Sequence, residues 1–203
     1  MEIKNIESHA KNYGIPIIRT ESHKILQDIV EKQKPKNILE IGTAVGYSGM
    51  LMLSACDGKL ITIEHDEKLI KQAKQNFKHN YQLSRVKVVK GDCMVEIAKM
   101  VASKQYDDFF DLIFLDGPKA QYGSLLDSLV MLLKPNGVFV ADNVLFRGYV
   151  NGETTAPTKR YKTIIKRLND FIENCKNHQF LTDFNLISVE DGMLFAKKVK
   201  NEK

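Results

Sequence analysis

The sequence lacks several features that would each point to a particular class of protein. No apolar run is long enough to span a membrane, and the first residues lack the apolar core of a signal peptide. The cysteines, Cys56, Cys93 and Cys175, are widely spaced without a C-x-x-C pair, which argues against a disulfide framework and a zinc site. There is no repeat, linker or low-complexity tract. We therefore expect one cytoplasmic domain.

The bulk composition is that of an ordinary soluble globular protein. Hydrophobic residues make up 43% of the chain and charged residues 27%. A length of 203 residues is enough for one α/β domain with a substantial core. The formal net charge of +5 permits a polyanionic partner but does not require one.

One further absence concerns nucleotide binding, because the dinucleotide fingerprint G-x-G-x-x-G does not occur. The segment 37–48, NILEIGTAVGYS, instead reads as a buried parallel strand, a turn bracketed by Gly42 and Gly46, and the start of a helix. Glu40 lies beside this turn, where a carboxylate would repel a pyrophosphate and attract a cation. The turn therefore favours S-adenosylmethionine over NAD.

A second acidic residue ends the next predicted strand, Lys59–Glu64. A carboxylate at this strand end can accept hydrogen bonds from both ribose hydroxyls of a nucleoside. Taken alone, Glu64 could equally be a solvated strand end. Because it follows the glycine turn at the spacing of a nucleotide site, we interpret it as a ribose ligand.

The remaining pattern predicts an α/β fold that opens with two helices, in residues 1–14 and 21–34. Strands are expected at 85–90, 111–116 and 138–143, and helices at 47–56, 67–80, 94–103, 120–133 and 158–176. Asp191-Gly192 predicts a hairpin turn between antiparallel strands at 181–189 and 193–199. Asp92, at the end of the third strand, has two open interpretations: contact with an adenine amino group, or the N-cap of the next helix.

Hard oxygen ligands end the fourth and fifth predicted strands, namely Asp116, Asp142 and Asn143. The carboxyl ends of parallel strands share one rim of a sheet, where ligands of open α/β folds bind. Two carboxylates and a carboxamide at such a rim suit Mg²⁺, which takes oxygen ligands and keeps positions open for substrate. The strand ends therefore predict a magnesium site.

The segments ILEIGTAVGYS, ITIE, LDGPKAQY and ADNVLFRG resemble the Mg²⁺- and S-adenosylmethionine-dependent O-methyltransferases of the catechol and caffeoyl-coenzyme A type. The resemblance runs from about Lys36 to Gly148 and, more weakly, to the terminal hairpin. It implies a Rossmann-like methyltransferase fold with a seven-stranded, mostly parallel sheet, an antiparallel C-terminal hairpin strand and helices on both faces. The whole chain, 1–203, would be one methyltransferase domain with residues 1–35 as a helical cap. Size and the stretch Pro16 to Glu21 are similar to the bacterial branch that includes tRNA 5-hydroxyuridine methyltransferase, and this branch implies a homodimer.

The resemblance also assigns roles to individual residues. The predicted cofactor residues are Glu40, Gly42, Tyr47, Ser48, Glu64, Asp92, Cys93 and Asp116; the metal ligands are Asp116, Asp142 and Asn143; and the catalytic residues are Lys119 and Asp116. Lys119 matches the family's catalytic lysine, although Gly117-Pro118 departs from the residues that many relatives carry there. Lys119 can act as a general base only if the nearby cation and partial burial lower its pKa from about 10.4. It could otherwise be a solvated lysine in the first helical turn.

The acceptor is less strongly indicated than the reaction. A catechol and 5-hydroxyuridine both offer two neighbouring oxygens to a metal. Six cations, with Tyr161 interposed, together with the metal chemistry, slightly favour tRNA; they are Arg147, Lys159, Arg160, Lys162, Lys166 and Arg167. Such a run is also typical of a solvated helix face. The alternatives are a small-molecule catechol-type O-methyltransferase and, less favoured, a non-catalytic nucleoside- or RNA-binding protein.

Overall fold

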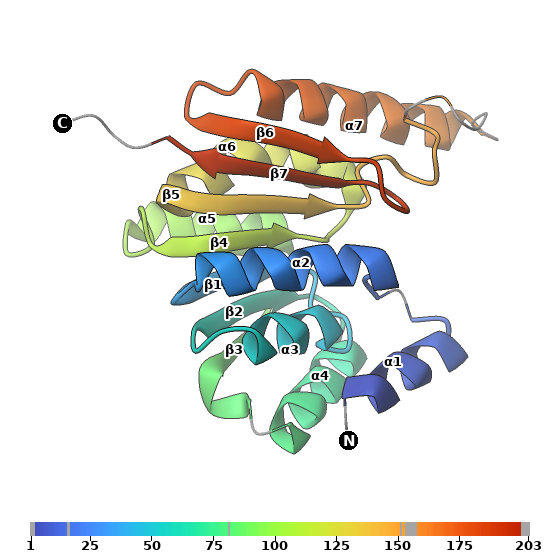
Figure 1. Ribbon diagram of the computed structural model, residues 1–203, viewed down its shortest axis with the longest axis vertical. Coiled ribbons are helices and arrows are strands. Elements are labelled where there is room, and N and C mark those ends of the chain that lie inside the picture. The colour runs from blue at the N-terminus through green and yellow to red at the C-terminus, as the bar shows by residue number, and fades with distance from the viewer. Residues whose placement is uncertain (1–2, 16, 81, 151, 153–157, 200–203) are drawn as a thin grey trace.

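A sheet of seven strands in the order β3-β2-β1-β4-β5-β7-β6 forms the centre of the molecule (Figure 1). The computed structural model describes residues 3–15, 17–80, 82–150, 152 and 158–199. Neighbouring strands from β3 to β5 are parallel, whereas β7 lies antiparallel between β5 and β6. The strands are β1 Asn37–Ile41, β2 Lys59–Glu64, β3 Val86–Lys90, β4 Phe110–Leu115, β5 Leu133–Asp142, β6 Leu181–Ile187 and β7 Met193–Lys198.

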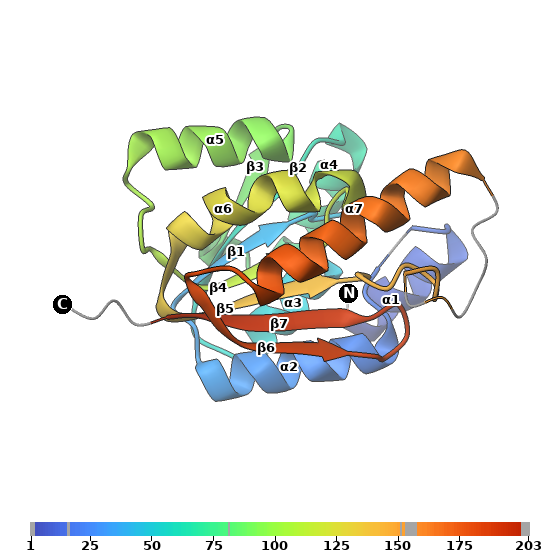
Figure 2. The same cartoon turned by 90° about the horizontal axis from the view of Figure 1, so that it is seen from above.

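Helices cover both faces of this sheet (Figure 2). They are α1 Ile3–Asn12, α2 Thr20–Gln33, α3 Tyr47–Ser54, α4 Glu67–His79, α5 Cys93–Ser103, α6 Tyr122–Leu132 and α7 Lys159–Lys176, with short 3-10 turns η1 Leu83–Arg85 and η2 Lys119–Gln121. The alternating side chains of the strands enter two hydrophobic clusters, one with α1–α4 and the other with α5–α7. In β1, for example, Ile38 joins the α1–α4 cluster and Leu39 joins the α5–α7 cluster.

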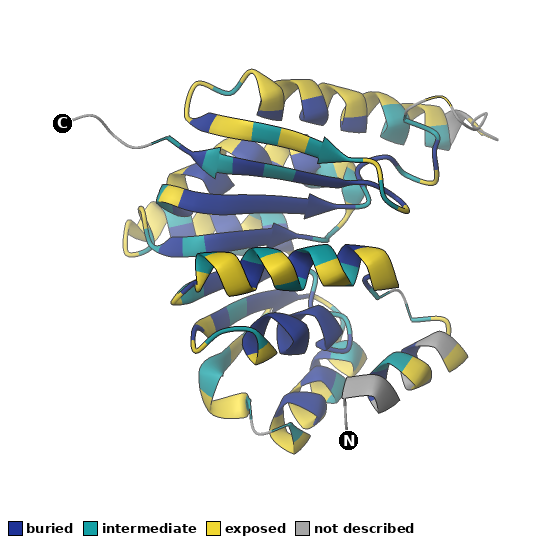
Figure 3. Cartoon of the chain, viewed as in Figure 1, coloured by how far each residue is buried: buried dark blue, intermediate teal, exposed yellow. Residues whose placement is uncertain are grey.

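The central strands are buried on both faces, as expected of parallel strands between helical layers (Figure 3). The α/β class, the antiparallel terminal hairpin and the mostly parallel sheet are therefore confirmed. No helix in the described ranges combines the length and apolar character that crossing a bilayer requires.

The start of β5 is the one strand boundary that the sequence places wrongly by several residues. We expected a turn at 134–137 and a strand only from Val138, but β5 begins at Leu133. Phe110 pairs with Leu133 while Leu112 pairs with Val138, so β5 holds extra residues at a shift of register. Asn136 accommodates this irregularity with φ +63°. Long-range pairing with β4 thus overrides the local turn signal.

The turn of the β6–β7 hairpin fastens the N-terminal segment to the sheet. Glu190 Oε2 accepts hydrogen bonds from the backbone N–H and the hydroxyl of Ser22, each at 3.0 Å, in the first turn of α2. Arg19 Nη2 lies 2.9 Å from Asp191 Oδ2, and the backbone N–H of Arg147 donates to Asp191 Oδ1 at 3.2 Å. The hairpin therefore links the residues before α2 to the loop after β5.

Candidate active site

A glycine turn joins β1 to α3 at the carboxyl edge of the sheet. Gly42 has φ +99°, and a Cβ at this position would lie 2.3 Å from the backbone oxygen of Asp116. The close approach arises because the backbone N–H of Asp116 donates to Ile41 O at 2.9 Å, which holds the ends of β1 and β4 together. Only glycine fits both the backbone conformation and the space. The turn thus brings the first and fourth strand ends to one place.

A pocket of about 410 Å³ opens at this edge. Its walls come mainly from the ends of the five parallel strands, β1 to β5, and from the segment before α2. The lining residues are Ile17, Ile18, Ile41, Gly42, Thr43, Ala44, Tyr47, Ser48, Ile63, Glu64, His65, Leu69, Gly91, Asp92, Cys93, Asp116, Gly117, Pro118, Lys119 and Asn143. Nine of the eleven residues that we predicted as site residues therefore share one pocket.

Glu64 lies in this pocket as predicted, at the end of β2, and is 8% exposed. Its Oε2 accepts from the backbone N–H of Ala44 at 3.0 Å, and its Oε1 accepts from those of His65 and Asp66 at 2.9 and 3.0 Å. The carboxylate is therefore held rigidly against the glycine turn, with its remaining lone pairs for a ligand. The alternative interpretation, a solvated strand end, does not fit this burial.

Glu40, which we predicted as a cofactor residue, lies behind the pocket wall and does not line the pocket. The alternation along β1 turns its side chain toward α3, where it is fully buried. Oε1 accepts from Ser48 Oγ at 2.5 Å and Oε2 from Thr62 Oγ1 at 2.6 Å, and Thr62 Oγ1 is 2.6 Å from Thr43 Oγ1. Burial raises the pKa of Glu40 to about 7. Glu40 thus supports two pocket residues, Thr43 and Ser48, from behind.

The raised pKa of Glu40 predicts a specific pH dependence of stability. The folded state keeps a proton that the unfolded state releases above about pH 4.5, so Glu40 lowers the free energy of unfolding progressively between about pH 4.5 and pH 7. The loss is on the order of 3 kcal/mol. Glu40→Gln keeps hydrogen-bonding groups at both positions and removes the charge. In urea unfolding, we expect the free energy of unfolding of Glu40→Gln to rise relative to that of the wild type as pH increases from about 4.5 to about 7. Parallel pH dependences of the two proteins would contradict the raised pKa of Glu40.

Two neighbouring residues after β3 also face the pocket. Asp92 is the N-cap of α5, because its Oδ1 accepts from the backbone N–H groups of Met94 and Val95 at 2.9 and 3.3 Å. The N-cap interpretation is therefore confirmed. Asp92 also lines the pocket, and its contact with an adenine stays a prediction. Cys93 Sγ lies 2.9 Å from Gln121 Oε1, and burial raises the pKa of its thiol. The cysteine is therefore protonated at neutral pH.

At the other end of the pocket, Asp116, Lys119 and Tyr122 form a connected group. Lys119 Nζ donates to Asp116 Oδ1 and to the Tyr122 hydroxyl, each at 3.0 Å. The Tyr122 hydroxyl in turn lies 3.2 Å from Leu115 O and 3.1 Å from Asp142 O. The fully buried Tyr122 therefore ties Lys119 to the ends of β4 and β5. We did not predict it, although its position three residues after Lys119 was a usable signal.

This environment changes the interpretation of Lys119 as a general base. Burial acts against its charge, but Tyr122 and the Asp116 carboxylate outweigh burial and raise the pKa of Lys119. In the protein alone, burial therefore does not meet the condition for a general base, and Lys119 is an ammonium group. A cation held at Asp116 would act against the positive charge of Lys119, so the loaded site sets the protonation of Lys119.

Asp142 and Asn143 end β5 beside this group. Asp142 is 1% exposed, and its Oδ1 accepts from the backbone N–H of Asn143 at 2.8 Å. Burial and the neighbouring Asp116 raise the pKa of Asp142 to about 7. Asn143 lines the pocket with φ +59°, a conformation that asparagine tolerates better than most residues. Asp116 and Asn143 thus line the same pocket, and Asp142 lies close enough to Asp116 for their charges to repel, although it does not line the pocket.

The structure does not by itself reveal a metal site. Among the described residues, no group of three or more His, Cys, Asp and Glu side chains is arranged to hold an ion. The predicted ligands are not a group of this kind, because they are two aspartates and an asparagine, Asn143. The donor chemistry nevertheless fits a hard divalent cation, because all three side chains offer oxygen and the mutual repulsion of two carboxylates favours a cation between them.

Part of the predicted basic segment is engaged in packing. Arg167 Nη1 donates to Ala120 O at 3.3 Å, which supports the η2 turn that carries Lys119. Tyr161 stacks on Phe146 with ring centroids 5.4 Å apart. The side chains of Lys159 and Arg160, like Pro16 and residues 153–157, lie outside the described residues. Lys162 and Lys166 are exposed on α7.

Comparison with known proteins agrees with this geometry. Residues 2–199 match the O-methyltransferase family. A catechol O-methyltransferase from Niastella koreensis is 33% identical over 146 residues, which cover 70% of this chain and 65% of that relative, a little under two thirds of its length. A caffeoyl-CoA O-methyltransferase from Stellaria longipes is 25% identical over 86% of this chain and 73% of its own.

Solved structures resemble the fold over nearly its whole length. A Staphylococcus aureus protein provisionally assigned as a caffeoyl-CoA O-methyltransferase gives a TM-score of 0.87 at 28% identity, covering 98% of this chain and 92% of that one. The SAH-bound methyltransferase PaMTH1 of Podospora anserina gives 0.74 at 26% identity, covering 89% and 80%. The match over residues 2–199 shows that this chain belongs to the O-methyltransferase family.

Proposed function

We propose that the protein transfers a methyl group from S-adenosylmethionine to a hydroxyl of an acceptor that carries two neighbouring oxygens. The observation that carries this proposal is a single pocket lined both by Glu64 and by Asp116 and Asn143. A carboxylate suited to a ribose and oxygen ligands suited to a divalent cation therefore open into the same space. The family membership supports the reaction class.

S-adenosylmethionine is the proposed methyl donor. The SAH-bound Podospora anserina neighbour supports it, because SAH is the product left when S-adenosylmethionine loses its methyl group. Glu64 would accept from the ribose hydroxyls, while Thr43, Tyr47 and Ser48 of the glycine turn line the adjoining wall. Ile17 and Ile18, held by the Arg19–Asp191 ion pair, would shield the ligand from water.

Glu64→Gln tests the donor site. We expect S-adenosylmethionine to bind about ten- to a hundredfold more weakly, because a hydrogen bond to a charged group contributes about 1.5–3 kcal/mol. Isothermal titration calorimetry measures the change. Glu67→Gln is the matched control, since it removes the same charge from an exposed side chain outside the pocket lining. Equal affinity of both variants would remove Glu64 from the donor site.

Asp116, Asp142 and Asn143 would hold a Mg²⁺ ion. When bound there, the ion would lower the pKa of an acceptor hydroxyl and orient its two oxygens. The proposed ligands come from the rigid ends of β4 and β5, whose backbone carbonyls share the Tyr122 hydroxyl as a partner. This arrangement would fix the position of the acceptor relative to the donor pocket.

In the transfer itself, the acceptor oxygen forms a bond to the methyl carbon as the carbon–sulfur bond breaks. The sulfonium becomes a neutral thioether, and the acceptor loses one proton. Such a displacement needs mainly positioning and an anionic oxygen. Lys119 lies at the Asp116 end of the pocket, where its nitrogen can take the proton or, as an ammonium group, stabilise the oxyanion.

For the acceptor, we propose the 5-hydroxyl of a modified uridine in tRNA, which would yield 5-methoxyuridine. The exposed cations Lys162 and Lys166 near the loop after β5 support an RNA partner. The second candidate is a small catechol-type acceptor, which the name of the Niastella koreensis relative favours. A homodimer is also proposed, and light scattering at micromolar concentration tests it.

One experiment separates these possibilities. Purified protein is incubated with S-adenosylmethionine and either a catechol or tRNA containing 5-hydroxyuridine, with Mg²⁺ or with excess chelator. We expect metal-dependent methylation of the nucleoside, measured by mass spectrometry. Methylation of the catechol alone would move the assignment to a small-molecule enzyme. Absence of S-adenosylmethionine consumption with both acceptors would overturn the proposed activity.

A further inference from the structure

The segment 68–90 contains seven lysine and arginine residues and no aspartate or glutamate. The whole chain has 30 such cations and 25 acids, so the rest of the chain carries two more acids than cations. The positive net charge of the protein therefore resides in this one stretch. It includes most of α4, η1 and β3, on the opposite edge of the sheet from the basic segment of α7 (Figure 1).

Two of the seven cations are committed to the fold. Arg85 donates to the backbone carbonyls of Leu53, Cys56 and Gly58, which closes the end of α3. Lys90 pairs with Glu67. The other five are exposed and form no ion pair with any part of the chain that the structure describes; they are Lys68, Lys71, Lys74, Lys78 and Lys87. Their charge is thus available to a partner.

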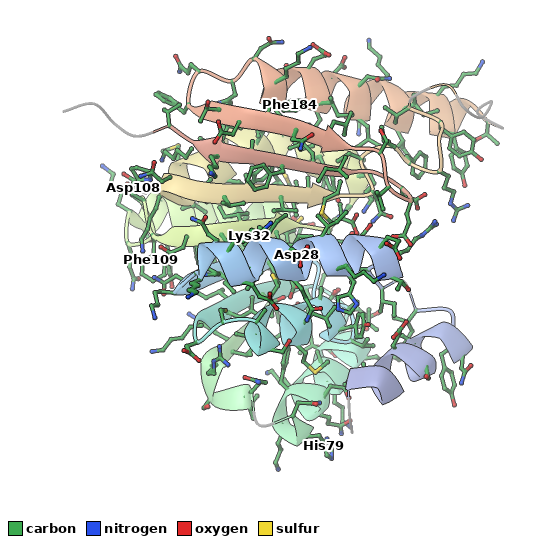
Figure 4. The ribbon with its side chains drawn as sticks, viewed as in Figure 1. Asp28, Lys32, His79, Asp108, Phe109 and Phe184 are labelled. Carbon is green, nitrogen blue, oxygen red and sulfur yellow. The ribbon has the colours of Figure 1, made fainter. Side chains whose placement is uncertain are left out.

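Two of these lysines, Lys68 and Lys71, line a groove between α4 and α1, and Lys74 and Lys78 lie on the same helix outside the groove lining. The groove has a volume of about 480 Å³ and is lined by Ile6, Lys68, Lys71, Gln72, Gln75, Asn76 and His79. His79, labelled at the lower end of the molecule in Figure 4, has Nδ1 at 2.7 Å from Gln75 O, which leaves Nε2 for a ligand. The walls therefore combine ammonium groups with amide and imidazole hydrogen-bonding groups.

The groove adjoins the active-site pocket. Lys68 lines the groove and Leu69, the next residue, lines the pocket. Asn76 of the groove donates through Nδ2 to Val45 O at 2.9 Å, which lies within the glycine turn. A chain bound along α4 would therefore pass beside the pocket in which the transfer is proposed to occur.

We propose that the α1–α4 groove and the lysines of α4 bind the phosphate backbone of RNA. From Lys68 to Lys78 the helix rises about 15 Å, a span that covers several successive phosphates of one strand. Of the described residues that line the groove, all except Ile6 carry hydrogen-bonding side chains, which suits a nucleic-acid backbone better than a membrane surface. This inference rests on the proposed function, which makes RNA the acceptor. It adds the surface of the protein on which that RNA is held.

The test replaces Lys71, Lys74 and Lys78 together with glutamine. Its matched control replaces Lys32, Lys36 and Lys176, three exposed lysines on α2, before β1 and at the end of α7. Affinity for bulk tRNA is measured by fluorescence anisotropy at several salt concentrations. We expect the α4 variant to bind more weakly and its slope of log affinity against log salt to fall by about two to three, because each lost phosphate contact lowers the slope by roughly one. The control variant should behave as the wild type.

Further measurements test the proposed RNA-binding surface independently of the proposed methyl transfer. Circular dichroism and thermal unfolding establish that both variants are folded, and any methylation of a small catechol should be equal in both. Wild-type protein that binds polyglutamate as tightly as tRNA, or that binds no tRNA, would overturn the proposed surface, as would equal losses in the two variants. Lysine-dependent tRNA binding without consumption of S-adenosylmethionine would keep the surface and refute the proposed function.

Discussion

Asp142→Asn should lower the rate of methyl transfer by about three orders of magnitude while S-adenosylmethionine binds as before. The reason is that a metal ion contributes several kcal/mol of charge stabilisation, and each 1.36 kcal/mol corresponds to a tenfold change in rate. Asp142 faces the Asp116 end of the site and is absent from the pocket lining, so its loss should spare the donor. Single-turnover methylation and calorimetry measure the two quantities.

Asparagine is the informative substitution because it should preserve the fold. It keeps an oxygen that accepts from the Asn143 backbone N–H, and it removes a charge that burial and Asp116 disfavour. Thermal stability above pH 7 should therefore not fall. The matched control is Asp183→Asn, at a position 57% exposed on β6. Full activity of Asp142→Asn, or of the wild type in excess chelator, would refute the proposed metal site.

Lys119→Met should lower the rate by about 10²–10⁴-fold with little change in donor affinity, the range for loss of a positioned acid–base group. Methionine retains the length of the side chain while removing the nitrogen that contacts Asp116 and Tyr122. Lys99→Met, a change at an exposed α5 lysine that pairs with Glu96, is the control. Rates are measured at saturating donor and acceptor.

The pH profile distinguishes the two roles open to Lys119. If its neutral amine takes the proton, the wild-type rate should rise with pH up to the pKa that Lys119 has in the loaded site. If its ammonium group stabilises the oxyanion, the rate should instead fall above that pKa. In either case, Lys119→Met should abolish the change of rate with pH that the pKa of Lys119 causes. A variant that keeps the wild-type rate and profile would remove Lys119 from the reaction.

Local rules of the sequence determined much of the fold and of the pocket. Asp66, Asp92 and Thr158 are N-caps because their side chains accept from backbone groups two or three residues ahead, a relation that does not depend on the rest of the fold. The position of the pocket at the carboxyl edge of the sheet also follows from a general rule. Parallel strands end at one edge, so Glu64, Asp116 and Asn143 were expected to meet before any coordinates were known.

Only the tertiary structure decided features that depend on packing between distant segments. Glu40 lies behind the pocket because α3 covers that face of β1, and Lys119 carries a raised pKa because it meets Tyr122 and Asp116 in a buried space. The start of β5 follows its pairing with Phe110, against the local turn signal. The α1–α4 groove joins helices more than fifty residues apart in the chain, and sequence spacing contains no information on such a contact.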